Sequence, residues 1–249
     1  MADFLRLPTM KKLSLIAAFV ASVALLGSCL RDGDAQPERV GGMTFINTFI
    51  EAEAVFYYVD RNAIQGFQAL DYRTYGPQWP VYIPPATERR LEIYSTYEDN
   101  RLVDTMFSVQ DSVYYSSIVY GTHDDPRHFI TEDRIPEGVE NPEEIAGVRF
   151  YNLANTDQRL TLRIGDVESV PAFRNRPLET LETGKEGEAF TPVATGTYTV
   201  KVVDEDGETV ATREGTVELT PGSYTSIFLT GDERNASTYY VGVVRQWVN

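Results

Sequence analysis

This 249-residue chain contains two histidines, whose side chains are candidate metal ligands. His123 and His128 lie in one segment with Asp124 and Asp125, and imidazole with carboxylate is a common ligand set for transition metals. The segment contains Pro126 and has no helical spacing, so nothing in the sequence fixes the geometry that a metal requires. We therefore expect a solvated loop here and no metal site, with the alternative that His128 lies at the start of a strand through Phe129 and Ile130.

A second candidate is the acidic run in which Asp204, Asp206 and Glu208 alternate like the first ligands of a calcium-binding loop. Such a loop needs glycine at its sixth position and glutamate at its twelfth. Thr209 and Gly215 stand there instead. A hairpin turn is the simpler interpretation, and calcium binding remains the alternative.

Motifs for catalysis are absent from the sequence. It contains no Gly-x-Ser-x-Gly nucleophile elbow and no glycine-rich phosphate loop. Carboxylates are plentiful, but glycoside hydrolysis needs a pair held at a defined separation in a cleft, and composition does not provide that. We predict that the protein is not an enzyme and has no cofactor.

Aromatic residues are the third candidate, and they concentrate in segments 56–58 (FYY), 72–82 (YRTYGPQWPVY) and 94–97 (YSTY). Neighbouring residues of a strand point to opposite faces, so segment 56–58 must place aromatic rings outside the local core unless another domain covers them. Exposed Tyr and Trp on a β-surface bind sugars or proteins, whereas inter-domain packing and cross-strand pairs are the alternative. The predicted binding surface consists of Tyr72, Tyr75, Trp79 and Tyr82.

The charge of the chain limits its partners. Its formal net charge is −15, with 37 acidic residues against 22 Lys and Arg. Nucleic acids need a basic face, so we predict no nucleic-acid partner. The same charge argues against adhesion of the folded surface to anionic lipid.

The elements that position these residues are short β-strands, most clearly in residues 194–231. Tyr198, Val200 and Val202 alternate with polar residues, which is the pattern of a half-buried strand. Asp206-Gly207 and Pro221-Gly222 are turn signals between successive strands. Closely spaced strands of this kind predict an all-β sandwich or barrel.

An internal repeat predicts two such domains. Segments 42–47 (GMTFIN) and 147–152 (GVRFYN) match at an offset of 105 residues. Near the ends of both copies, a later match at an offset of 110 pairs Tyr114, Ile118 and Gly121 with Tyr224, Phe228 and Gly231. We predict tandem immunoglobulin-like β-sandwiches at residues 41–133 and 147–249, joined by an exposed linker at 134–146. Residues 178–188 are expected to form an exposed insertion that includes a helical turn.

The N-terminal residues have the features of an export signal. Lys11 and Lys12 precede an apolar run over residues 13–26, which is shorter than a membrane-spanning helix needs. Residues 26–29 (LGSC) resemble the lipobox of bacterial lipoproteins, and Cys29 is the only cysteine. We expect a lipoprotein signal peptide at 1–28, with Met10 as a second candidate start, lipidation of Cys29 and a flexible tether at 29–40. Leu30 replaces the aspartate of inner-membrane retention, which favours the outer membrane.

The second copy contains the segments VRFYN at 148–152, LTLRI at 160–164, ATGTYTVKV at 194–202 and LTPGSYT at 219–225. In these segments it resembles the bacterial family called domain of unknown function 4397. The first copy matches poorly, since Glu88-Arg89-Arg90 replaces the Gly-x-Tyr approach to a strand and Asp111 replaces the turn glycine. The resemblance implies tandem β-sandwiches in a secreted or lipid-anchored protein, and it implies no activity.

These features together predict a non-enzymatic protein of the cell envelope. Its membrane contact would be the lipid on Cys29, and its partner an envelope protein or a glycan. The alternative is a calcium- or carbohydrate-binding module that is accessory to an envelope system.

Overall fold

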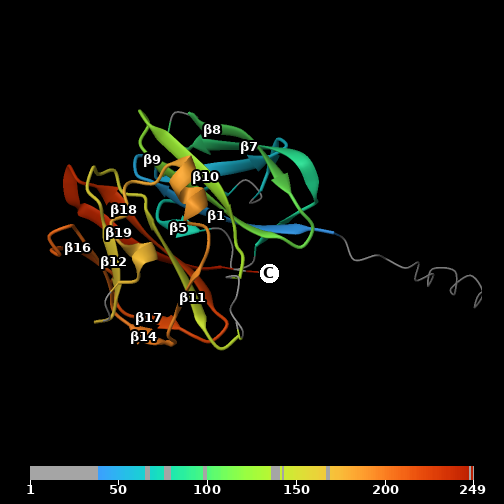
Figure 1. The fold of residues 1–249 in the computed structure, drawn as a ribbon. Helices are drawn as coiled ribbons and strands as arrows, with labels where there is room; N and C mark the ends of the chain where they lie inside the picture. Colours follow the sequence, from blue (N-terminus) through green and yellow to red (C-terminus); the bar gives the residue numbers. More distant parts are fainter. Residues whose placement is uncertain are drawn as a thin grey trace, which may run out of the picture. The chain divides into compact units, whose positions relative to one another are not determined.

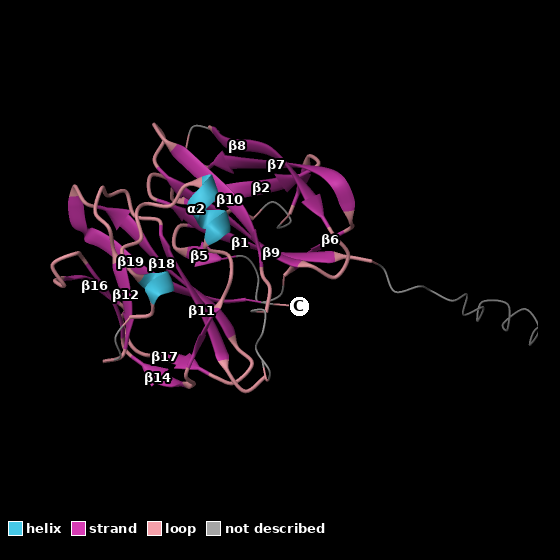
Figure 2. Ribbon diagram, viewed as in Figure 1, coloured by secondary structure: helices cyan, strands magenta, loops and turns pink. Residues whose placement is uncertain are grey.

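β-Strands account for most of the described residues, as the alternating sequence patterns predict (Figure 1). The computed structural model describes residues 39–64, 68–75, 80–97, 100–135, 141, 143–166, 169–246 and 248. Within these ranges the helical elements are the 3₁₀-helix η1 (Pro171–Phe173) and the α-helix α2 (Leu181–Glu186) (Figure 2). The all-β class is confirmed.

The first repeat has two sheets. In one sheet β1 pairs in parallel with β9, whose other neighbour is β10, and β5 and β6 pair with the free side of β1. The strands of this sheet are β1 (Gly41–Phe49), β5 (Thr74–Tyr75), β6 (Val81–Ile83), β9 (Tyr114–Gly121) and β10 (Pro126–Glu132). In the other sheet β7 pairs with β2 and β8. Its strands are β2 (Ala54–Val59), β3 (Asn62–Ala63), β4 (Leu70–Asp71), β7 (Ala86–Ser95) and β8 (Arg101–Val109).

The second repeat has the same plan. Its main sheet has the order β13-β11-β18-β19, with β11 parallel to β18. These strands are β11 (Ala146–Asn152), β13 (Thr191–Val193), β18 (Tyr224–Asp232) and β19 (Asn235–Gln246). The opposite side consists of β12 (Thr161–Ile164), β14 (Gly196–Tyr198), β15 (Val200–Val203), β16 (Thr209–Thr212) and β17 (Val217–Leu219). The predicted tandem sandwich architecture is therefore present.

Both repeats use their first glycine in the same way. Gly42 lies opposite Tyr114 across the parallel pair β1–β9, and Gly147 lies opposite Tyr224 across β11–β18. A Cβ atom at Gly42 would lie 2.5 Å from the Tyr114 ring, and one at Gly147 would lie 2.4 Å from the Tyr224 ring. Only glycine allows this approach, so the shared position reflects packing.

The matching asparagines have a structural role as well. Asn47 Nδ2 donates to Leu70 O at 2.8 Å and Asn47 Oδ1 accepts from Phe49 N at 3.0 Å. Asn152 makes the equivalent bonds to Arg176 O and from Ala154 N. Both asparagines are fully buried, so each satisfies backbone groups that would otherwise lack partners away from water.

The first repeat places its turn residue one position later than the sequence predicts. Ser112 has a φ of 61°, and the matching Gly222 has a φ of 69°. Ser112, and not Asp111, therefore stands at the position of the turn glycine. A left-handed conformation is costly for a residue with a Cβ atom, so this is a local departure of the first repeat from the preferred turn sequence.

Three apolar clusters hold the described residues together. One lies inside each repeat, around Phe45 and Phe150 respectively. A third joins the repeats through the outer faces of their main sheets, and its buried members are Ile46, Ile118, Tyr120, Phe129, Tyr151, Leu153, Phe228 and Val244. The repeats therefore share a hydrophobic core and are not joined through the chain alone.

A buried ion pair crosses this shared core. Arg149 on β11 and Asp133 after β10 are each 1% exposed, and their charged groups lie 2.6 Å apart. Arg149 also donates to Ser226 Oγ and Ser116 Oγ, and Ser116 donates to Asp133. A buried charge needs such partners, so this network ties the two repeats in one arrangement.

The insertion at residues 178–188 contains the predicted helical turn, but it is not simply exposed. Thr180 and Thr183 form a capping box at the start of α2. Gly184 packs against the Phe129 ring, where a Cβ atom would lie 2.8 Å from the ring, and Figure 2 shows α2 beside β10. Glu179 is fully buried and pairs with Arg176 at 2.8 Å. The expected exposure is wrong for these residues because α2 covers part of the first repeat.

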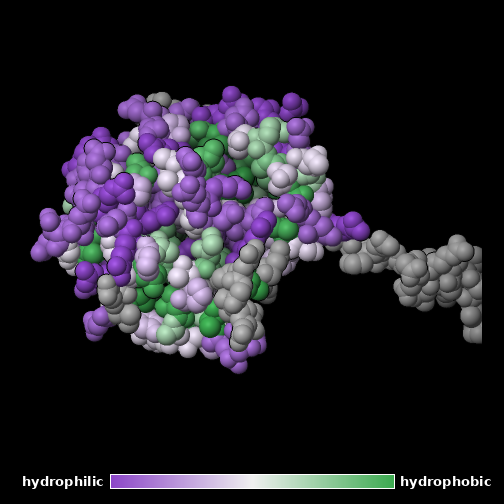
Figure 3. All heavy atoms as spheres, viewed as in Figure 1, coloured by the Kyte–Doolittle hydropathy of each residue, from purple (hydrophilic) through white to green (hydrophobic). Residues whose placement is uncertain are grey.

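Several predictions concern residues outside the described part of the chain. The signal peptide, Cys29 and the predicted tether up to residue 38 lie there, as do residues 136–140 and 142 of the predicted linker. In the part that the structure describes, no helix is both long enough and apolar enough to cross a membrane. Hydrophilic side chains cover much of the face shown in Figure 3, with apolar atoms between them.

Candidate functional site

The predicted aromatic surface divides into parts with different surroundings. Tyr72 is half-buried, its hydroxyl lies 3.5 Å from Thr230 Oγ1 of the second repeat, and Arg73 stacks between the rings of Tyr72 and Tyr240. Tyr72 thus takes part in packing between the repeats.

Tyr75 and Tyr82 are exposed, at 45% and 57%, on the strands that pair with β1. Among the described residues, neither ring contacts another aromatic side chain. Trp79 lies outside the described residues. A binding role for this surface stays a prediction.

The histidines make separate contacts. His123 Nε2 lies 3.2 Å from Glu51 O, and its ring contacts Phe49 and Tyr97. His128 Nε2 lies 2.9 Å from Ser117 Oγ, and burial lowers the pKa of His128 to about 3. Among the described residues no group of at least three His, Cys, Asp and Glu could hold a metal ion.

Asp204 belongs to the hairpin turn that the sequence favours. Its Oδ1 accepts from the backbone N–H groups of Asp206 and Glu208, at 3.1 Å and 2.8 Å. Gly207 has a φ of 84°, which completes the turn. One carboxylate oxygen of Asp204 is therefore engaged in holding the backbone.

The structure gathers other aromatic residues on the outer face of the β2–β7 sheet. Tyr57 points into the core and is 2% exposed, whereas its neighbours Phe56 and Tyr58 are half-buried on the outer face, as the alternation predicts. The register pairs Phe56 with Tyr94. The Tyr58 ring centroid lies 5.7 Å from that of Tyr94 and 6.5 Å from that of Phe56. The three rings therefore form one cluster.

These rings line a shallow hollow of about 400 Å³. We call it the aromatic hollow, and it consists of Phe56, Tyr58, Arg61, Glu92 and Tyr94. Glu92 is paired with Tyr58 across the strands and is 7% exposed. Tyr94 donates from its hydroxyl to Glu92 Oε1 at 3.2 Å. The hollow therefore combines apolar ring surfaces with fixed polar groups.

Two arginines fix the polar side of the aromatic hollow. Arg90 forms a bidentate pair with Asp104, at 2.8 Å and 2.7 Å, and lies 3.3 Å from Glu92. Arg101 lies 2.8 Å from Asp104 and 3.5 Å from Glu92. The Arg90 guanidinium lowers the pKa of Asp104, so this carboxylate is charged at neutral pH. The network holds Glu92 and Tyr94 in place before any ligand binds.

Arg61 reaches the rim through a tight turn at the end of β2. Asp60 and Arg61 have φ values of 49° and 68°. The Asp60 carboxylate anchors this turn by accepting from Arg90 N at 2.9 Å and from Arg89 Nη1 at 2.7 Å. The hydrogen bond from Arg89 lowers the pKa of Asp60. Arg61 itself is exposed and has no hydrogen-bond or ion-pair partner among the described residues, so its guanidinium is available to a ligand.

The predicted binding surface includes none of the residues of this hollow, although the sequence does indicate aromatic side chains near it. Alternation in segment 56–58 places Phe56 and Tyr58 on one face, and segment 94–97 is aromatic. The register that sets Tyr94 beside Phe56 arises from pairing between strands that are distant in the chain. No local pattern gives that register. Only the pairing of β2 with β7 in the folded protein brings Tyr94 next to Phe56.

Comparisons with known proteins assign no family. No protein-family model matches the chain, and no curated protein matches it at a significant level. The resemblance to domain of unknown function 4397 stays a prediction. Among solved structures, a match is CBMbc, a family CBM26 protein from Eubacterium rectale Amy13K in complex with maltoheptaose. It is 11% identical, covers 82% of this chain and 96% of that chain, and has a TM-score of 0.25, which does not establish a common fold.

Proposed function

We propose that this chain is a non-enzymatic binding protein of the cell envelope and that its aromatic hollow binds a sugar ring of a glycan. The observation that supports the proposal is the cluster of Phe56, Tyr58 and Tyr94 on the outer face of a sheet. Aromatic rings that are half-exposed and held by their neighbours provide contact area with little further loss of side-chain freedom on binding.

A saccharide suits the lining of the hollow. One face of a pyranose ring carries C–H groups that pack on aromatic rings, and its hydroxyls need donors and acceptors around the edge. Arg61 offers donors and Glu92 offers an acceptor at the same hollow. Small-molecule sites have volumes of roughly 300–1,000 Å³, so about 400 Å³ has room for a saccharide unit.

Replacement of Tyr58 by alanine tests the site. We expect Tyr58→Ala to weaken binding of a neutral oligosaccharide by about 3- to 10-fold, because each such aromatic contact contributes about 0.5–1.5 kcal/mol. The ligand is first found by screening a panel of neutral oligosaccharides, and its affinity is then measured by titration calorimetry. Thermal melting confirms that the variant is folded.

Tyr82→Ala is the matched control, since it removes an exposed tyrosine of the same repeat from outside the aromatic hollow. It should leave the affinity unchanged. If Tyr82→Ala weakens binding and folded Tyr58→Ala does not, the site belongs to segment 72–82 and the proposal is wrong.

We also propose that Cys29 carries a lipid that anchors the protein in the outer membrane. The basis is the LGSC segment after a basic and apolar stretch, together with the absence of any other cysteine from the sequence. Two acyl chains are enough for stable anchoring. Cys29→Ser should move the protein from the membrane to the soluble fraction and abolish labelling with radioactive palmitate. Membrane retention with persistent labelling of this variant would contradict the anchor.

A further inference from the structure

The second repeat carries a hollow at the position equivalent to the aromatic hollow. It has a volume of about 430 Å³ on the outer face of the β12–β15–β16 sheet. Thr161, Arg163 and Asp166 lie 105 residues after Phe56, Tyr58 and Arg61. This is the offset of the sequence repeat, so the two hollows occupy matching surfaces.

The strand register confirms the equivalence. Tyr58 pairs with Glu92 in the first repeat, and Arg163 pairs with Lys201 in the second. Phe56 pairs with Tyr94 in the first repeat, and Thr161 pairs with Val203 in the second. The second hollow therefore lies at the equivalent position of its repeat but has a different lining, since two cationic side chains replace a tyrosine and a glutamate. We call it the cationic hollow, after Arg163 and Lys201.

The cation pair is unusual for this protein. Like charges directly opposite each other on neighbouring strands are destabilising. Neither Arg163 nor Lys201 has a hydrogen-bond or ion-pair partner among the described residues. The chain has a net charge of −15 and only four lysines. In so acidic a chain, two unpaired cationic side chains would not be expected to face each other by chance. An anionic ligand would relieve the repulsion.

The other charged groups of the cationic hollow lie around this pair. Arg174 donates from Nε to Ser169 O at 2.5 Å, which holds it at the wall. One oxygen of Asp204 is engaged in the hairpin turn. Asp166 and Glu205 are exposed acceptors in the lining. A simple anion gains nothing from these carboxylates, whereas the hydroxyl groups of a sugar can donate to them.

We infer that the cationic hollow is a second binding site, specific for a saccharide that carries a carboxylate or sulfate group. Arg163 matches a carboxylate or sulfate with two parallel hydrogen bonds, and Lys201 adds a point charge beside it. The anion-binding part stands on the residues of this hollow alone, and the saccharide part rests on the proposed function. The first repeat would then recognise a neutral sugar and the second an acidic sugar, each through the equivalent surface of its own sheet.

Titration calorimetry with tetragalacturonate, maltotetraose and inorganic sulfate tests the inference. We expect tetragalacturonate to bind more tightly than maltotetraose at the cationic hollow, and to lose affinity as salt is raised because screening weakens the charge contacts. Lys201→Glu and Arg163→Gln should each weaken tetragalacturonate binding at least about tenfold, since a charge-assisted hydrogen bond contributes about 1.5–3 kcal/mol.

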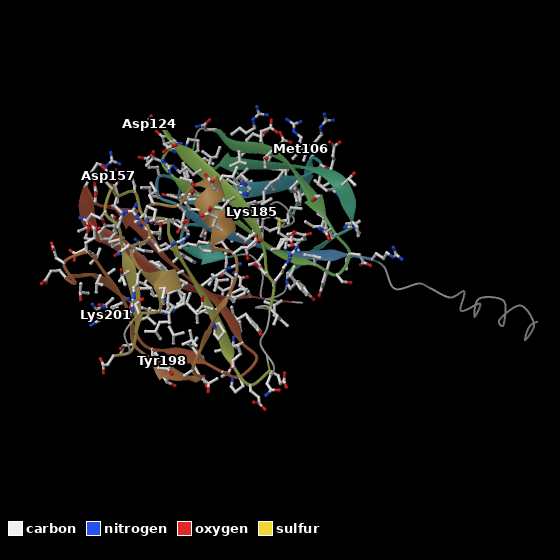
Figure 4. The ribbon with its side chains drawn as sticks, in the orientation of Figure 1. Met106, Asp124, Asp157, Lys185, Tyr198 and Lys201 are labelled. Carbon is white, nitrogen blue, oxygen red and sulfur yellow. The ribbon has the colours of Figure 1, made fainter. Side chains whose placement is uncertain are left out.

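Lys185→Gln is the matched control, because Lys185 is an exposed lysine on α2 (Figure 4) and has no ion-pair partner in the part of the chain that the structure describes. It should leave the affinity unchanged. Both test variants should fold, since each removes a like-charge opposition, and their melting temperatures should equal or exceed that of the parent protein. Tyr58→Ala should retain tetragalacturonate binding, which separates this site from the aromatic hollow.

The outcomes are distinct. Absence of tetragalacturonate binding, or equal affinity in Lys201→Glu and the parent protein, overturns the inference. Binding of inorganic sulfate as tightly as tetragalacturonate overturns its saccharide part. Loss of neutral-sugar binding in Tyr58→Ala with retention of tetragalacturonate binding supports both sites. Loss of both ligands in Tyr58→Ala overturns the assignment of tetragalacturonate to the second repeat.

Discussion

His128 illustrates how the fold changes the chemistry of a single side chain. The imidazole lies on β10 against Ser117, and burial lowers its pKa to about 3 from an ordinary value near 6.5. A group suited by type to metal binding or proton transfer is therefore neutral over the physiological pH range. Its role in the described structure is a hydrogen bond across the β9–β10 pair.

This histidine makes stability depend on pH. Between about pH 6.5 and 3 the unfolded chain binds a proton at His128 that the folded chain does not bind. Protonation therefore favours the unfolded state, so the free energy of unfolding has its full value above pH 6.5 and decreases as the pH falls below it. We expect a loss of about 1–2 kcal/mol between pH 7 and pH 5. Urea denaturation at both pH values measures it.

Two variants separate this effect from other titrations. His128→Gln should lose less stability between pH 7 and 5 than the parent protein, because the side chain no longer titrates. His123→Gln keeps His128 and should retain the full loss. Equal losses in the parent protein and in His128→Gln would contradict the prediction.

Individual elements follow their local sequence closely. The Asp-Gly hairpin before β16 and the strands on either side of it lie where alternation and turn residues predict. The first repeat tolerates a poorer turn sequence, with Ser112 where the second repeat has Gly222. Elements also show where local reasoning fails, since α2 is the predicted helical turn and yet packs on Phe129 of the other repeat.

At the scale of the whole molecule, the main structural feature is the buried contact between the two repeats. Arg149 and Asp133 form the polar centre of a shared apolar cluster. The burial of Asp133 raises the pKa of its carboxyl, and the coulombic attraction of Arg149 opposes that rise. Loss of either side chain would therefore leave the charge of the other buried without a counter-ion.

Removal of one partner should be costly. We expect Arg149→Met to lower the free energy of unfolding by about 3–5 kcal/mol, because it leaves a carboxylate buried with too few donors. The double variant Arg149→Met/Asp133→Leu should lose much less, since no unpaired charge remains. Urea denaturation, followed by circular dichroism, measures both values. A double variant that is as unstable as the single one would contradict this account.

The shared core also predicts one cooperative unfolding transition for the parent protein, because neither repeat can expose its main sheet without exposing the other. Separate transitions for the two repeats, detected by fluorescence and circular dichroism, would show that the inter-repeat contact contributes little.

The sequence by itself determined the strand class, the turns, the tandem repeat and the expectation of an anchored N-terminus, because these depend on local alternation, special backbone conformations and short motifs. Segment 56–58 also showed that aromatic rings must lie outside the core. Only the tertiary structure decided which residues meet. The partners of Tyr58 and Arg163 come from strands about 34–38 residues away, and the register of those pairs has no local signal. The two hollows are therefore visible only once the strands are paired.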